Sequence, residues 1–312
     1  MNRQKLWPYS FQRSEKTTDL TRLPRPTNQP DQLKQDLSEF GYCLYDSAFS
    51  LEKLDEINRQ IYLQIEAEKN HGLQIKNETG STICANLLNK DEVFQSLVTI
   101  PEIDVLVEHL LGYDFLLSSL SVVQTQPGTK AQGLHIDQAF LQFEAPVACV
   151  VNVIWMIEDF SDENGGTRVI PGSHLWDSQK TIQYHEDTAL PGIPFDELTS
   201  AGGGSGENPS DTIAICAKAG TCLILDGRVL HGTGRNTATK NRTAVAAYYT
   251  RPYIRQLTNP FISIEDSRLL SLSDRLKEQL GFKSWFYFGG AEIPGRSLNL
   301  NELKPQKLIG KL

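Results

Sequence analysis

Residues 212–249 read TIAICAKAGTCLILDGRVLHGTGRNTATKNRTAVAAYY, and this stretch decides the fold. Three short runs within it, 212–217, 221–226 and 242–249, are rich in Ile, Val, Thr, Ala and Tyr. Gly, Asn and Asp separate the runs, which is typical of strands joined by turns. The stretch therefore predicts consecutive β-strands.

The same pattern extends toward the N-terminus. Four more segments have strand-like composition: Leu116–Gln126, Gln138–Phe143, Val147–Ile157 and Thr167–Ile170. Seven or more short strands preceded by helices predict a mainly β fold, with two sheets forming a barrel and helices packed outside it. A chain of 312 residues can form one such domain.

Helical periodicity flanks the β region. Apolar residues recur every three or four positions in four segments, which predicts helices there. These segments are Pro30–Phe40 (ended by Gly41), Leu51–Ile65 (behind an N-cap at Ser50), Pro101–Leu111 (ended by Gly112) and Glu265–Leu280 (ended by Gly281). A short strand is expected over Tyr42–Tyr45.

The composition excludes several classes of protein. The net charge is −8, which argues against bulk binding to nucleic acid or to anionic membranes. The most apolar segment, Val147–Ile157, is too short to span a bilayer, and the N-terminus resembles no secretion signal. The five cysteines are scattered without a C-x-x-C pair, which favours free core thiols and a cytoplasmic location.

Three residues have the pattern of a metal site. His135 and Asp137 are separated by one residue at the start of an expected strand, so both side chains point to one face. His231 follows another strand. Two histidines and one carboxylate form the facial triad of non-haem Fe(II) oxygenases, which leaves three coordination positions open. The same set also suits Zn²⁺ in a hydrolase.

Arg242 favours iron over zinc. It lies eleven residues after His231, at the start of a strand. A buried guanidinium binds a carboxylate bidentately, and so suits the distal carboxylate of a dicarboxylate co-substrate. An oxygenase that reduces O₂ needs a two-electron co-substrate, and 2-oxoglutarate can chelate the metal through its 2-oxo acid end.

A family resemblance covers about Gln32 to Gln256. The segments that carry it are QGLHID (132–137), ENGGTRVIPGSH (163–174), DGRVLHGTGRN (226–236) and NR (241–242). Together they resemble the phytanoyl-CoA dioxygenase family. The resemblance implies a double-stranded β-helix (a jelly roll), Fe(II), 2-oxoglutarate and O₂ as cofactor and co-substrates, and ascorbate as an activator in vitro.

The resemblance also implies residue roles. His135, Asp137 and His231 would bind iron, and Arg242 would bind the distal carboxylate of 2-oxoglutarate. Three further residues resemble positions that hydrogen-bond the co-substrate: Gln132, Thr167 and Thr233. Related halogenases lack the metal-binding carboxylate, so its presence favours hydroxylation, which can lead to dealkylation or desaturation, with succinate and CO₂ as co-products.

The expected organisation is an N-terminal arm (1–30), an oxygenase domain (31–256) and a C-terminal helical extension (257–312). The expected substrate is a small molecule, either a secondary metabolite or an amino-acid derivative such as a mycosporine-like amino acid. One alternative is an acyl-CoA 2-hydroxylase, and another is a non-catalytic β-barrel that binds a metabolite. The sequence leaves open whether the protein is a monomer or a homodimer.

Several other residues admit two interpretations. His174 and Trp155 are expected to be structural, whereas Arg251 and Arg255 are either surface ion-pair partners or contacts for an anionic substrate. The glycine run Gly202–Glu207 lacks the Gly-Lys-Ser/Thr of a phosphate-binding loop, and the loop-like stretch Leu190–Asp211 around it is interpreted as a mobile loop or lid.

Overall fold

Two antiparallel sheets form the centre of the molecule. The computed structural model describes residues 18–141, 145–177, 179–181, 183–184, 206–286 and 288–289. The large sheet has the strand order β1 (Tyr42–Tyr45), β8 (Cys222–Asp226), β5 (Val150–Met156), β10 (Arg242–Thr250), β4 (Leu116–Thr125), β3 (Thr82–Cys84), β2 (Ile75–Lys76). The small sheet has the order β7 (Ile213–Ala214), β6 (Thr167–Val169), β9 (His231–Thr233).

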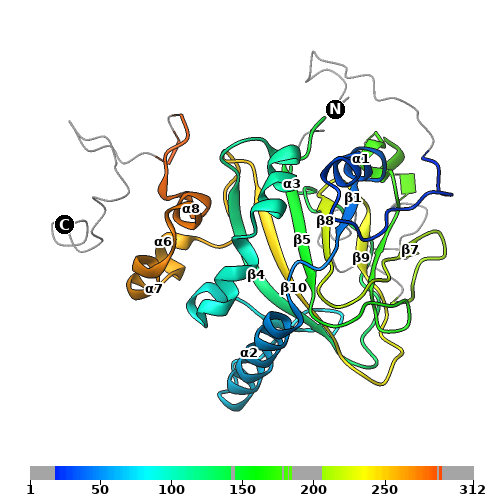
Figure 1. Cartoon of the computed structure of the whole chain (residues 1–312). Helices are drawn as coiled ribbons and strands as arrows, with labels where there is room; N and C mark the ends of the chain where they lie inside the picture. Colours follow the sequence, from blue (N-terminus) through cyan, green and yellow to red (C-terminus); the bar gives the residue numbers. More distant parts are fainter. Residues whose placement is uncertain are drawn as a thin grey trace, which may run out of the picture.

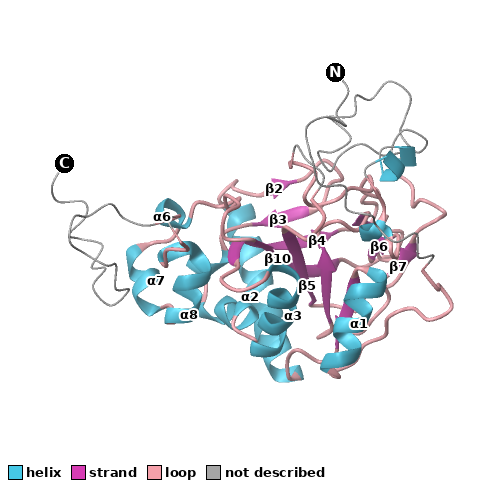
Figure 2. Ribbon diagram, turned by 90° about the horizontal axis from the view of Figure 1, so that it is seen from above, coloured by secondary structure: helices cyan, strands magenta, loops and turns pink. Residues whose placement is uncertain are grey.

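Helices surround the large sheet. The longer ones are α1 (Pro30–Phe40), α2 (Leu51–Asn70) and α3 (Pro101–Leu111). Short helical turns are η2 (Leu87–Asn89), η3 (Glu92–Val98) and η4 (Ser173–Leu175). A group of small C-terminal elements lies beside β4: α6 (Pro260–Ser263), α7 (Asp266–Ser271), α8 (Asp274–Lys277) and the π-helical η5 (Glu278–Phe282) (Figures 1 and 2). Within the described residues, no helix has both the length and the apolar character needed to cross a bilayer.

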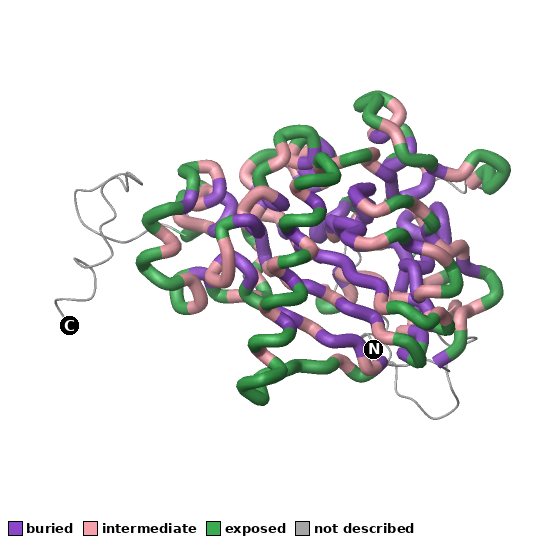
Figure 3. Tube along the Cα trace, turned by 60° about the horizontal axis from the view of Figure 1, so that its bottom comes forward, coloured by how far each residue is buried: buried purple, intermediate pink, exposed green. Residues whose placement is uncertain are grey.

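The two faces of the large sheet have different roles. On β10, Val245, Ala247 and Tyr249 join the main hydrophobic core, which also contains buried residues from α1, α2 and α3. The alternate residue Ala244 belongs to a second core, which reaches Val169 of the small sheet. Figure 3 shows buried residues running along the strands, with exposed residues concentrated in the loops and on the outer helices. We call the face in the main core the outer face, and it packs against the helices. The opposite, inner face lies toward the small sheet.

Most of the expected elements are confirmed. The helix over Pro30–Phe40 ends at Gly41, which has φ +79°, a conformation that favours glycine. Ser50 caps α2, since its side chain accepts a hydrogen bond from the backbone N–H of Lys53. Of the expected N-terminal arm, residues 1–17 lie outside the described residues. Thr27 lies beside β1, with its backbone N–H 3.0 Å from the Leu44 carbonyl oxygen.

Two expected elements are wrong. The strand expected over Gln138–Phe143 is a turn in its described part, residues 138–141. The backbone N–H of Gln138 donates to Gly227, and its side-chain carbonyl accepts from the N–H of Cys149, so these bonds fix a turn instead of a ladder. The single helix expected over Glu265–Leu280 is divided into α7, α8 and η5, because Ser273 starts a new helix by accepting from the N–H of Leu276.

We expect the C-terminal elements to contribute to the stability of the sheet. Leu276 of α8 is fully buried in the main core, whereas Leu270 of α7 is 68% exposed. Leu276→Ala should lower the free energy of unfolding by about 2–4 kcal/mol through the cavity that it creates. The control Leu270→Ala should change it by less than about 0.5 kcal/mol. Denaturant unfolding followed by circular dichroism measures both, and equal effects would contradict this packing.

Candidate active site

His135 and His231 are joined through their backbones. His231 is the first residue of β9, and His135 forms an antiparallel bridge with it. The N–H of each residue donates to the carbonyl oxygen of the other, at 2.9 and 3.0 Å. This pairing places the two imidazole rings 4.5 Å apart, measured between their centroids. Hydrogen bonds between two distant segments therefore bring the two side chains together.

Asp137 completes a compact group. Its two carboxylate oxygens lie 3.8 Å from Nε2 of His135 and 3.7 Å from Nε2 of His231. One candidate ligand atom from each residue lies within 4.8 Å of the others, which is the spacing of a site that can hold a metal ion. The expectation that His135 and Asp137 share a strand is wrong. His135 lies in a bridge and Asp137 in the following turn.

The orientation of each imidazole is fixed by the chain itself. Nδ1 of His231 lies 3.0 Å from the Val229 carbonyl oxygen, and Nδ1 of His135 lies 3.2 Å from the Gly133 carbonyl oxygen. Because a carbonyl oxygen only accepts, each Nδ1 is the protonated nitrogen. In a neutral imidazole this leaves Nε2, the nitrogen nearer Asp137, to bind a metal.

Four cross-strand rows on the inner face of the large sheet lead from Asp137 to Arg242, and we call this region the chamber. Its first row consists of Asn152, Tyr248 and Ser119, paired across β5, β10 and β4, and all three are partly buried. Two rows follow, Ile154–Ala246–Ser121 and Met156–Ala244–Val123, in which Ile154, Met156 and Ala244 belong to the second core. The last row contains Arg242 and Thr125, which are both buried. Burial therefore increases along the strands, and Arg242 lies at the buried end of the chamber.

Arg242 has the environment of an anion-binding group. Its side chain is 2% exposed, donates 2.6 Å to the Gly165 carbonyl oxygen and lies over the ring of Phe160. Its Nε has no hydrogen-bond partner, and no carboxylate of the described residues forms an ion pair with it. Burial lowers the pKa of Arg242 to about 10, which the charge of Glu158 only partly offsets. A buried cation without an anion is unfavourable, so this site suits a carboxylate ligand.

The three residues expected to contact a co-substrate lie between Arg242 and the histidines. Thr167 of β6 pairs with Thr233 of β9, and Val169 pairs with His231. The two pairs are two residues apart, which corresponds to about 7 Å along the strand. The side-chain carbonyl of Gln132 accepts from the N–H of Thr233 at 3.2 Å. This leaves the Gln132 amide nitrogen without a partner among the described residues.

Two residues that the sequence analysis missed contact Asp137. Tyr248 donates a short hydrogen bond from its hydroxyl to the Asp137 carbonyl oxygen, and Nδ2 of Asn152 lies 3.4 Å from Asp137 Oδ2. Burial, with a smaller effect of the Asp137 charge, raises the pKa of Tyr248, so the hydroxyl stays protonated and donates. The alternation along β10 could have identified Tyr248, because it shares a face with Arg242.

Other residues singled out in the sequence lie elsewhere. Trp155 is buried in the main core, as expected, and His174 is buried with Nε2 3.3 Å from the Ser38 carbonyl oxygen. Arg251 donates to the carbonyl oxygens of Ala148 and Leu110, which is a structural role. Arg255 is exposed and has no ion pair within the described part of the chain. Residues 190–205 of the expected lid lie outside the described residues.

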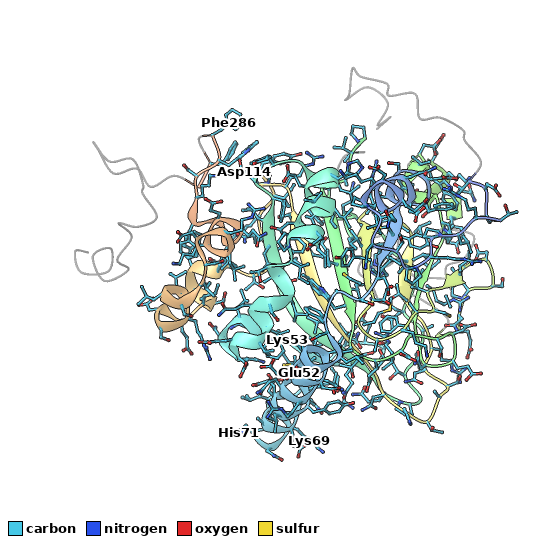
Figure 4. All side chains as sticks on the ribbon, in the orientation of Figure 1. Glu52, Lys53, Lys69, His71, Asp114 and Phe286 are labelled. Carbon is cyan, nitrogen blue, oxygen red and sulfur yellow. The ribbon has the colours of Figure 1, made fainter. Side chains whose placement is uncertain are left out.

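A second hollow lies away from the histidines. A cavity of about 390 Å³ separates the end of β10 from the C-terminal elements, and none of the three candidate metal ligands lines it. Asp114, labelled in Figure 4 near Phe286, lies at its edge and forms an ion pair with Lys283 at 3.0 Å. Arg255 also lines this cavity, and none of the chamber residues does.

Comparisons with known proteins identify the class of fold and then the family. Two sheets, with the histidine–aspartate group between them, are the architecture of the jelly-roll oxygenases. The family model "Phytanoyl-CoA dioxygenase (PhyH)" matches residues 37–244. The chain belongs to this family.

Curated relatives agree with this assignment. The chain is 31% identical to Dioxygenase af480 of Aspergillus fumigatus, over 61% of this chain and 55% of the relative. It is 29% identical to Multifunctional dioxygenase prhA of Penicillium brasilianum, over 56% of this chain and 54% of the relative. The alignments thus span about half the length of these relatives.

The fold is also that of two solved enzymes. One is the non-heme alpha ketoglutarate dependent carbocyclase SnoK from nogalamycin biosynthesis, with TM-score 0.57, 19% identity, and coverage of 80% of this chain and 94% of SnoK. The other is the epimerase SnoN from the same biosynthesis, with TM-score 0.53, 19% identity, and coverage of 72% and 83%. Their likeness confirms the jelly roll.

We expect a divalent metal to stabilise the protein through the three candidate ligands. At about 100 times the dissociation constant, a ligand of the folded state adds about 2.7 kcal/mol to the free energy of unfolding. Anaerobic Fe(II), or Co(II) as a substitute, should therefore raise the melting temperature, and Asp137→Ala should abolish this increase. The control His71→Ala, at the exposed end of α2 in Figure 4, should retain it. An increase that survives in Asp137→Ala would place the metal elsewhere.

Proposed function

We propose that the protein is an Fe(II)- and 2-oxoglutarate-dependent dioxygenase that oxidises a C–H bond of a small molecule. The observation that carries this proposal is the buried Arg242, which has no ion-pair partner among the described residues, on the strand whose Tyr248 contacts Asp137 of the candidate metal site. A metal site alone would also fit a hydrolase. A buried guanidinium without an anion adds a specific requirement for an acidic co-substrate.

The residues fit the cofactor and co-substrate. His135, Asp137 and His231 would hold Fe(II), since two imidazoles and one carboxylate leave positions open for a co-substrate and O₂. Iron and 2-oxoglutarate together supply the oxidising chemistry, which releases succinate and CO₂. Arg242 would bind the distal carboxylate of 2-oxoglutarate. Gln132, Thr167 and Thr233 would line the path between Arg242 and the metal.

The chain contributes orientation. Ala244 and Ala246 lie on the inner face of β10 between Arg242 and Tyr248, so only small side chains of this strand separate the two functional residues. Because Arg242 would hold the distal carboxylate in a fixed place, it would also set where the 2-oxo acid end of 2-oxoglutarate lies relative to the metal ligands. Because Arg242 and Thr125 are buried, the distal carboxylate would bind away from water, where its interaction with Arg242 is strongest.

We propose a small polar substrate. Ser119 and Ser121 of β4 lie on the inner face of the large sheet, where both are partly buried and form no side-chain hydrogen bond within the described residues. Such a wall suits a ligand with hydroxyl, amine or carboxylate groups. SnoK and SnoN are described as enzymes of nogalamycin biosynthesis, which supports a secondary metabolite. Amino-acid derivatives, including mycosporine-like amino acids, are candidates for testing.

Succinate formation tests the reaction class and the substrate together. Purified protein with Fe(II), 2-oxoglutarate and O₂ should form succinate faster when a substrate is present, so a panel of polar metabolites identifies the substrate class. Mass spectrometry of the stimulating metabolite should show an added oxygen, or the corresponding dealkylated or desaturated product. Absence of succinate under all conditions, with metal bound, would refute the proposal.

We expect Arg242 to govern the affinity for 2-oxoglutarate. Hydrogen bonds to charged groups contribute about 1.5–3 kcal/mol, so Arg242→Ala should raise the KM for 2-oxoglutarate about 10- to 100-fold. Arg242→Lys should restore only part of the lost affinity. Lysine keeps the positive charge, but it lacks the planar guanidinium that binds a carboxylate through two hydrogen bonds. Arg255→Ala, which removes an exposed arginine outside the chamber, is the control and should leave KM unchanged. An unchanged KM in Arg242→Ala would exclude the assigned role.

A further inference from the structure

We propose that Asn152 and Tyr248 are positioning residues that hold Asp137 in the geometry required for metal binding. The inference rests on the proposed function, since it concerns the same metal site. Asp137 lies in a turn, and the ladder of a strand therefore does not fix the direction of its carboxylate. His135 and His231, in contrast, are fixed by their own bridge. Something else must orient the third ligand.

Two neighbouring strands supply that constraint. Asn152 of β5 and Tyr248 of β10 are directly paired across the large sheet, and both face the chamber. Tyr248 donates to the main-chain carbonyl oxygen of Asp137, whereas Asn152 donates to its carboxylate oxygen Oδ2 at 3.4 Å. One bond fixes the position of the residue and the other fixes the rotation of its side chain. Partners of this kind commonly orient the ligands of a metal.

Tyr248 and Tyr249 point to opposite faces of the large sheet, as consecutive residues of a strand do. Tyr249 belongs to the main core, whereas Tyr248 reaches Asp137. Beside them the register between β10 and β4 shifts, since Tyr248 pairs with Ser119 and Tyr249 with Leu117, which leaves Ser118 of β4 as the extra residue. Such bulges are frequent beside active sites. The hydroxyl of Tyr249 is buried and has no hydrogen-bond partner in the described structure.

Asn152 lowers the stability of the strand in which it lies, which is unfavourable for a residue with a purely structural role. It is the only polar residue of β5, whose other residues are all buried and apolar. Its Oδ1 is buried without a hydrogen-bond partner in the described part of the chain. An unpaired buried polar atom costs about 1–3 kcal/mol, and asparagine is unfavourable in strands. Replacement by an apolar residue of similar size should therefore stabilise the protein without metal.

The test measures metal affinity and stability separately. Asn152→Leu should raise the melting temperature of the metal-free protein and weaken Co(II) binding about 10- to 100-fold, because losing an orienting partner of a ligand typically has that effect. A merely structural role predicts that stability and affinity fall together. Anaerobic competition of the protein with a chelator gives the affinity, and the Co(II) absorption spectrum reports the ligand geometry, without any turnover.

Tyrosine variants provide a matched pair on one strand. Tyr248→Phe removes the hydroxyl that binds Asp137 and should weaken Co(II) binding about tenfold with a changed Co(II) spectrum. Tyr249→Phe removes a hydroxyl that binds nothing, and should change neither. Parental affinity in both Asn152→Leu and Tyr248→Phe, or equal losses in Tyr248→Phe and Tyr249→Phe, would overturn the inference. If the parental protein itself binds no divalent metal, the proposed function fails instead.

Discussion

The two-residue alternation of β10 is the constraint on which the rest of the structure depends. Val245, Ala247 and Tyr249 face the main core and hold the strand at the centre of the large sheet. The alternate positions carry Arg242 at one end and Tyr248 at the other, with only alanines between them. A single strand therefore joins the stability of the fold to both ends of the chamber, and a change of register by one residue would remove both functional side chains from it.

Backbone pairing provides the complementary half of the site. The bridge between His135 and His231 links a loop to the first residue of β9, and β9 also pairs with β6. Asp137 lies outside this ladder and is held by side chains of the large sheet. The group is thus supported by both sheets, and its geometry depends on the spacing between the sheets. This explains why a jelly roll, with two facing sheets, suits such a site.

The sequence predicted those features that depend on local periodicity. The apolar stripe of α2, the glycine stop of α1 and the long strands β4 and β10 follow from spacing alone. The turn at residues 138–141 was missed because distant partners, Gly227 and Cys149, decide its conformation. The division of the C-terminal helix was missed because the apolar spacing of 265–280 hides the new start at Ser273.

The sequence predicted the candidate metal ligands and Arg242, but not the residues that hold Asp137 in place. His135, Asp137, His231 and Arg242 stand out by residue type and order along the chain. Asn152 stands out as the one polar residue of an apolar strand, but its partner Asp137 is decided by how two segments pack together. A residue that acts through another residue is recognised only once the neighbours are known. The inner-face positions of strands that carry a known site residue are the places to search for such supports.

The most direct test of the role proposed for Arg242 compares two ligands that differ only at the end that Arg242 would bind. Anaerobic titration of the protein with bound Fe(II) should produce a weak visible charge-transfer band when a 2-oxo acid chelates the metal. 2-Oxoglutarate and 2-oxopentanoate have the same chain length, but the second ends in a methyl group instead of a carboxylate. If Arg242 binds the distal carboxylate, 2-oxoglutarate should bind about 10- to 100-fold more tightly. Equal affinities would contradict an anion site at Arg242.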